Sequence, residues 1–200
     1  IAVQPLDAEG KALALMRSWF VVMPNETQSC VGCHEGQGMT PTTAPAAAAR
    51  KRPENIREFL APVRGYSFDR DVQPVLDQYC AGCHNPDASK NIPNFSRKNP
   101  KIWRKFSESY LNLTKYVRRS GPESNQHMLA PLEFHADTSE LMQMLEKGHK
   151  GVKLDADSKA ALITWIDLNV PFFGTWKEVY PTVKYDGYER RKFFLAKYAN

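Results

Sequence analysis

Two short cysteine motifs carry the chemistry of this sequence. Residues 30–34 read CVGCH and residues 80–84 read CAGCH, and together they use all four cysteines of the chain. C-x-x-C-H is the attachment motif of c-type haem. Two thiols about one helical turn apart can add to the two vinyl groups of one haem, and the next histidine can reach the iron. We therefore expect two covalently attached haem c groups. Their cysteines and proximal histidines are Cys30, Cys33, His34, Cys80, Cys83 and His84.

Other uses of these cysteines explain less. A thioredoxin-like C-x-x-C needs a βαβ context, which is not visible here. A Cys₄ zinc site would span an unusually long spacing and leave both histidines without a role. Disulfides would use the same sulfur atoms. Two copies of the complete five-residue motif favour haem over all three.

Three histidines remain as candidate distal ligands. Iron favours imidazole, and a small monohaem cytochrome c takes its sixth ligand from the loop before its last helix. Here that loop carries His149, so we rank His149 first for the second haem, then His135, then His127. The first haem has no histidine nearby in sequence. Its sixth ligand is His127, His135, a residue of another subunit, or one of the methionines Met23, Met39 and Met128. The remaining alternative is that this iron has no sixth ligand.

The hydrophobic pattern predicts a mainly α fold of small cytochrome-c-like helical haem domains with long proline-rich loops. Apolar residues at helical spacing indicate helices within 10–27, over about 72–79, and from Trp103 to near Gly121. Further helices are expected after the caps at 138–139 and at Asp155, and over 189–198. The helix over 72–79 leads directly into Cys80.

A change in composition separates two units. Residues 40–49 read TPTTAPAAAA, a low-complexity stretch expected of an extended linker. We therefore assign residues 1–64 to a first haem segment with this linker. Residues 65–200 form a second cytochrome-c-like domain with an aromatic C-terminal tail.

Overall composition excludes several classes of protein. Apolar residues make up 42% of the chain and charged residues 24%, which excludes a wholly disordered or fibrous chain. No apolar run approaches the roughly 20 residues of a membrane span. The net charge is +5, but most basic residues are scattered, so we expect a solvated basic surface and no nucleic-acid partner.

The expected location follows from the cofactor. Haem is attached to cysteines on exported chains, so we expect a periplasmic or extracellular protein. The chain starts at Ile1 without a charged and apolar leader, as expected of a mature exported form or a piece of a longer protein.

Three segments resemble the hydrazine synthase α-subunit family and its relatives. They are MRSWF, MPNE and SCVGCHE between residues 16 and 35, RGYSF and VQPVL between 64 and 76, and WIDLNVP over 165–171. The resemblance extends over nearly the whole chain and is to the C-terminal two-haem part of that family, whose larger members carry a β-propeller ahead of it. It implies a five-coordinate catalytic haem at Cys30, Cys33 and His34. It also implies a bis-histidine relay haem at Cys80, Cys83 and His84.

Two functions follow as hypotheses. The first is electron transfer with redox partner proteins, with self-assembly into a homo-oligomer or filament as a further expectation. The second is a haem-based redox enzyme, or a catalytic fragment of one, acting on small nitrogen species at an open first haem. The family's enzyme has a tyrosine shortly after the first haem histidine, whereas here Glu35 and residues 36–38 follow His34. This difference favours electron transfer. We assign no catalytic residue.

Overall fold

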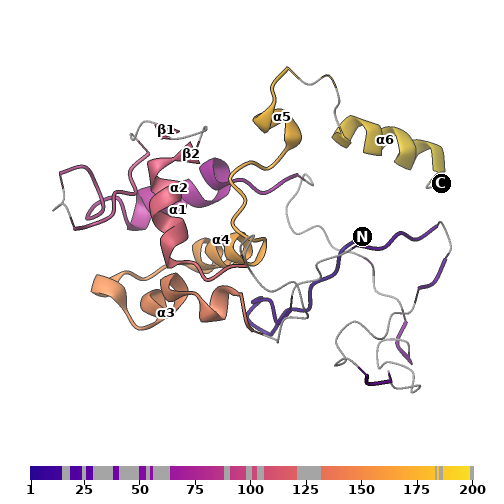
Figure 1. The fold of residues 1–200 in the computed structure, drawn as a ribbon, viewed down its shortest axis with the longest axis horizontal. Helices are drawn as coiled ribbons and strands as arrows, with labels where there is room; N and C mark the ends of the chain where they lie inside the picture. The colour runs from indigo at the N-terminus through magenta and orange to yellow at the C-terminus, as the bar shows by residue number, and fades with distance from the viewer. Residues whose placement is uncertain are drawn as a thin grey trace.

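The computed structural model describes residues 1–14, 19–23, 26–28, 38–40, 50–52, 55, 64–87, 91–97, 101–102, 106–120, 132–182, 184 and 187–198. Within these ranges the chain is mainly α, as predicted, with six α-helices, several single helical turns and one pair of two-residue strands. Helices α1 to α4 gather into one body, and α6 lies away from it beyond α5 (Figure 1).

The helix that leads into the second cysteine motif forms as expected. A π-helical turn, η2 (Phe68–Val72), continues into α1 (Gln73–Tyr79). Pro74 lies in the first turn of α1, where its missing N–H breaks no helical hydrogen bond. Val75 and Leu76 are buried, so α1 is held by its apolar face.

The next predicted helix is shorter than the apolar pattern indicated. Strands β1 (Lys101–Ile102) and β2 (Phe106–Ser107) pair antiparallel, with Ile102 opposite Phe106. Helix α2 (Glu108–Leu113) begins only after them and runs into the 3-10 turn η3 (Thr114–Tyr116). The start predicted at Trp103 is therefore wrong. Ser107 caps α2 by accepting the N–H of Tyr110, and this cap sets the start.

Helices α3 and α4 complete the body that contains α1 and α2 (Figure 1). The 3-10 turn η4 (Ala136–Thr138) precedes α3 (Glu140–Glu146), and the turn η5 (His149–Gly151) follows it. Helix α4 (Ala156–Asp167) starts at Asp155, whose carboxylate accepts the N–H of Ser158 at 2.7 Å and confirms the predicted cap. Helix α4 packs against η2 and η4, so it lies at the centre of the body.

The helices predicted near the two ends of the chain have different outcomes. Short α5 (Trp176–Val179) was not predicted, whereas α6 (Gly187–Tyr198) confirms the expected C-terminal helix. The helix predicted within 10–27 does not form in the residues described there. Residues 6 and 12 pair as an isolated bridge, and the N–H of Phe20 donates to the carbonyl of Ile1. These backbone groups therefore form hydrogen bonds between extended segments and not within a helix.

An aromatic cluster forms the core. Phe68 packs against Trp165 at 5.4 Å and edge-on to Tyr110 at 5.2 Å between ring centroids. The polar ends of these rings are satisfied, because Tyr110 donates to the Val170 carbonyl and Trp165 Nε1 donates to the Pro171 carbonyl. This core fixes η2 and α1 against α2 and α4.

Two glycines meet backbone to backbone beside this core. A Cβ on Gly65 would overlap the carbonyl of Gly174, and a Cβ on Gly174 would approach the Gly65 carbonyl oxygen to 2.9 Å. The segments before η2 and after Phe172 therefore approach closely only because neither position carries a side chain.

None of the helices in the described ranges is both long and apolar enough to cross a bilayer.

Candidate functional site

Helix α1 sets the spacing of the second motif. Past its end, the N–H of Cys80 bonds the Leu76 carbonyl at 2.9 Å and the N–H of His84 bonds the Cys80 carbonyl at 2.8 Å. The chain thus stays coiled through the motif, which keeps Cys80 and Cys83 about one turn apart. Cys80 is half-buried, Cys83 is exposed, and both are free thiols.

The ring of His84 is held from two sides. Its Nδ1 lies 2.9 Å from the carbonyl oxygen of Pro93, and its face stacks on Phe95 at 4.7 Å between centroids with a 24° angle. Because a carbonyl can only accept, Nδ1 must carry the proton, and Nε2 then keeps its lone pair. This is how metal-bound histidines are commonly oriented, with one nitrogen fixed by a carbonyl and the other free to bind.

His149 lies near His84 and lines the same cavity. The two rings lie 6.1 Å apart between centroids, at 37° to one another. A metal–imidazole bond is about 2 Å long, so two imidazoles on opposite sides of one ion have ring centres about 6 Å apart. The spacing of these two histidines therefore fits one shared iron.

A cavity of about 520 Å³ surrounds the pair. Ligand cavities commonly measure about 300–1,000 Å³. Its walls are mainly apolar and come from α1, η3, α3 and the segments around residues 92 and 152. The residues that line it are Tyr79, Cys80, Cys83, His84, Asn91, Ile92, Pro93, Phe95, Leu113, Tyr116, Leu141, Met144, Leu145, His149, Lys150 and Val152.

These residues fit a covalently held haem better than a bare metal ion. No group of three or more His, Cys, Asp or Glu side chains suited to a metal ion occurs in the part of the chain that the structure describes. A haem iron needs only two protein ligands because the porphyrin supplies four. Two histidines at this spacing, two adjacent thiols and a large apolar cavity match that requirement.

The thiol of Cys80 is not suited to redox exchange. Burial raises the pKa of Cys80 to about 11, with a smaller contribution from neighbouring Cys83. The thiolate is the nucleophile in disulfide exchange, and reactive cysteines have a lowered pKa. The environment of Cys80 therefore counts against a thioredoxin-like role.

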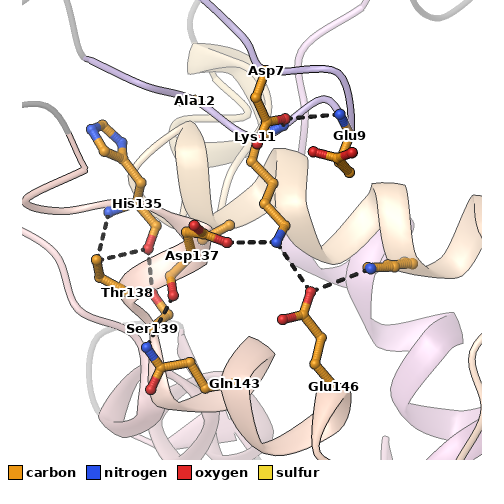
Figure 2. Close-up of polar contacts among 12 residues, drawn as sticks. Asp7, Glu9, Lys11, Ala12, His135, Asp137, Thr138, Ser139, Gln143 and Glu146 are labelled. Carbon is orange, nitrogen blue, oxygen red and sulfur yellow. Dashed lines mark hydrogen bonds and ion pairs between the residues drawn. The ribbon is translucent and has the colours of Figure 1, made fainter.

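His135 lies outside this cavity. It is 1% exposed and immediately precedes η4, and its ring points away from the ion pairs of Lys11 (Figure 2). Its Nδ1 is buried without a hydrogen-bond partner among the described residues. Burial lowers the pKa of His135, partly offset by the charge of Asp167, so the ring is neutral at neutral pH. As a ligand of the second haem, His135 is not supported by this placement.

The first motif lies outside the described residues. Cys30, Cys33 and His34 belong to that part of the chain, as do the remaining candidate ligands His127 and Met128. Met23 and Met39 are described and are 70% and 67% exposed.

An ion-pair junction ties the start of the chain to the second unit (Figure 2). The ammonium of Lys11 lies 2.5 Å from Asp137 and 3.1 Å from Glu146, and Glu146 also pairs with Lys159 at 3.3 Å. The hydrogen bond to Asp137 raises the pKa of Lys11 despite burial. Residues 1–14 therefore pack on the unit that contains the cavity, although the predicted boundary at residue 64 assigns them to the first unit.

Sequence reasoning missed the residues that orient the site. Pro93 and Phe95 lie in a segment predicted only as a loop. No motif or hydrophobic periodicity in that segment indicated that either residue contacts His84. Tyr79 lines the cavity and donates its hydroxyl to Asp155 at 2.7 Å, which connects α1 to the cap of α4. Tyr79 and Asp155 are far apart in sequence, so no local sequence pattern could predict this contact.

A family model matches the start of the chain. Residues 1–35 match the model of the hydrazine synthase alpha subunit middle domain. No curated protein and no solved structure matches the chain. Through this segment, which includes the first C-x-x-C-H motif, the chain is related to the hydrazine synthase family. The match is to a middle domain and to 35 residues, a narrower relation than the two-haem resemblance predicted over nearly the whole chain.

Proposed function

We propose that this chain is an extracytoplasmic dihaem c-type cytochrome that transfers electrons. The observation that carries the proposal is the pair His84 and His149, 6.1 Å apart across an apolar cavity that Cys80 and Cys83 also line. A haem held there would take up and release one electron at its iron.

The residues around the pair favour electron transfer at the second site. His84 and His149 would both hold the iron of the haem, so no position on it would remain for a substrate. The apolar walls would keep water from the iron, and burial of this kind tunes a reduction potential. Residues such as Tyr79, Leu113 and Leu141 supply these walls.

The edge of the cavity offers a route for electrons. Cys83 is exposed, Ile92 is 40% exposed, and Lys150 is also exposed. All three line the cavity, so one edge of a haem bound there would lie close to the surface. A redox partner protein docking at this edge would exchange electrons over a short distance.

The first haem is proposed from the motif alone. Residues 30–34 repeat the complete C-x-x-C-H pattern of residues 80–84. A second candidate function, a haem-based redox enzyme with an open first haem, is favoured by the match of residues 1–35 to a hydrazine synthase domain. The two functions differ in whether the first iron keeps a free position.

Haem attachment and an optical titration test the proposal. We expect the exported protein to carry two covalent haems per chain, and Cys80→Ser with Cys83→Ser to carry one. The double variant Cys30→Ser with Cys33→Ser is the matched control and should lose the other haem. Retention of two haems by either double variant would contradict the assignment.

The spectrum then separates the two functions. Two low-spin haems in the oxidised protein, with no high-spin band, would support the electron carrier. One high-spin haem per chain that binds carbon monoxide at a rate proportional to its concentration would favour the enzyme. Sedimentation at high concentration tests self-assembly, which a monomer at all concentrations would exclude.

A further inference from the structure

We propose that His149 is a displaceable ligand and that the second haem site also binds a small neutral diatomic molecule in its place. This inference rests on the proposed function, because it requires a haem between His84 and His149. It concerns the haem that would otherwise serve as a pure electron relay.

The two histidines are held very differently. His84 is fixed by the Pro93 carbonyl, by stacking on Phe95 and by the hydrogen bond from the Phe95 N–H to its own carbonyl. Within the part of the chain that the structure describes, no hydrogen bond holds the ring nitrogens of His149. A metal-bound histidine is normally held through its second nitrogen, so His149 lacks the restraint that His84 has.

The backbone around His149 is strained. Gly148 has φ of +91°, Lys150 has φ of +49° and Gly151 has φ of +78°. Glycine adopts this left-handed region without cost, but lysine does not. The loop therefore holds His149 toward the cavity in a conformation that Lys150 disfavours.

A second hollow lies behind the ring. A depression of about 360 Å³ is lined by His149 and Met144, which also line the haem cavity, and by Glu140, Gln143, Lys147 and Gly148. His149 is half-buried and thus forms part of the wall between the cavity and the outside. Rotation toward this hollow would bring the ring to solvent and to the polar side chains of Glu140, Gln143 and Lys147.

The position given up by the ring suits a small neutral ligand. The remaining wall on that side includes Leu141, Leu145 and Val152, which offer no hydrogen bond from their side chains. The iron–nitrogen bond to His149 would break and a bond to the incoming molecule would form, with no electron or proton transferred. Because displacement must come first, the rate of binding should level off as the ligand concentration rises.

Carbon monoxide is the probe for this step. The full-length holoprotein, reduced with dithionite, is mixed with increasing carbon monoxide and followed optically. We expect one component whose rate saturates in the wild type. In His149→Ala the same component should bind at a rate that rises linearly with concentration, which assigns it to the second haem.

Loop variants test the role of strain. Gly148→Ala places a side chain at a left-handed φ where no atom lies within 4 Å, so its effect comes from the backbone alone. We expect it to raise the limiting rate roughly tenfold. Lys150→Gly should lower that rate severalfold. Gly10→Ala is the matched control, because Gly10 has φ of +81°, equally open space and no contact with the cavity, and it should leave the rate unchanged.

The outcomes separate the inference from the proposed function. If reduced wild-type protein shows no saturating component although His149→Ala gains carbon monoxide binding, the inference is overturned and the bis-histidine haem stands. If His149→Ala leaves both the low-spin spectrum and carbon monoxide binding unchanged, the haem assignment between His84 and His149 fails. Equal limiting rates in Gly148→Ala, Lys150→Gly and wild type would also overturn the inference.

Discussion

The carboxylate of Asp167 accepts the backbone N–H of Ala12 at 2.8 Å, across 155 residues of sequence. Its other oxygen accepts the N–H of Ala136, also at 2.8 Å. Asp167 is 4% exposed and Ala12 is fully buried. One buried carboxylate at the end of α4 thus holds both the N-terminal segment and η4, next to the elements that carry His149.

Removal of this carboxylate should destabilise the protein. In Asp167→Ala the N–H groups of Ala12 and Ala136 lose a charged acceptor, so we expect unfolding free energy to fall by about 2–4 kcal/mol. The loss of unfolding free energy in Asp167→Asn should be smaller than in Asp167→Ala, since asparagine keeps one accepting oxygen. Urea unfolding measures the change. Exposed Asp157 on the same helix is the control, and Asp157→Ala should cost about 0.5 kcal/mol. Equal losses for the two alanine variants would contradict the prediction.

Asp167 also gives stability a specific pH dependence. Burial raises the pKa of Asp167, although the Ala12 and Ala136 N–H groups oppose the rise. An acid with a raised folded pKa contributes most stability when protonated, and that contribution is lost as pH rises through the folded pKa. We expect Asp167→Asn to remove this loss. The measurement is the difference in unfolding free energy between the variant and the wild type from pH 3 to 7, and a constant difference would contradict it.

Asp71 should show the opposite sign. Burial alone would raise the pKa of Asp71, but hydrogen bonds from Arg64 and from the Ser67 N–H outweigh it and lower the pKa. Its contribution is therefore present above the unfolded pKa of about 3.9 and is lost as pH falls through the lowered folded pKa. Asp71→Asn should cost about 2 kcal/mol at pH 7 and progressively less in acid. Exposed Asp69 in the same turn is the control, and Asp69→Asn should change neither stability nor its pH dependence.

Phe95 should matter through its ring. The ring stacks on His84, while its backbone bonds to His84 and Gln73 do not depend on the side chain. We expect Phe95→Ala to cost about 3–5 kcal/mol and Phe95→Leu about 1 kcal/mol. Both should shift the electron paramagnetic resonance of the proposed second haem in its oxidised state, as the His84 ring gains freedom. Ile92→Val, in the same cavity but more exposed, should leave that signal unchanged.

The axial ligand should control the reduction potential of the proposed second haem. Methionine ligation raises the potential relative to histidine. His149→Met should therefore raise it on the order of 0.1 V, a fraction of the ~0.8 V that axial ligands span. Redox titration by absorbance measures this. His135→Met should not move the same component, because His135 lies outside the cavity. A shift in His135→Met and none in His149→Met would reverse the ranking of the ligands.

Local signals in the sequence account for much of this arrangement. The helix before Cys80, the cap at Asp155 and the loop position of His149 all depend on residues close together in the chain, and each prediction agrees with the structure. The helix expected from Trp103 began late because Ser107 provides the cap and β1 pairs with β2. The orientation of His84 by Pro93, the Tyr79–Asp155 pair and the Asp167 junction depend on tertiary contacts. Hydrophobic periodicity carries no information about such contacts.

The contact between Gly65 and Gly174 provides a criterion for finding distant relatives. Their backbones touch across 109 positions of the chain, and either Cβ would collide with the other's carbonyl. Surface substitutions elsewhere usually change stability little, but these two positions constrain one another. A chain that aligns poorly elsewhere yet keeps a glycine shortly before the helix leading into C-x-x-C-H, and another shortly after the closing helix, would be a relative worth testing for the same opposed histidines.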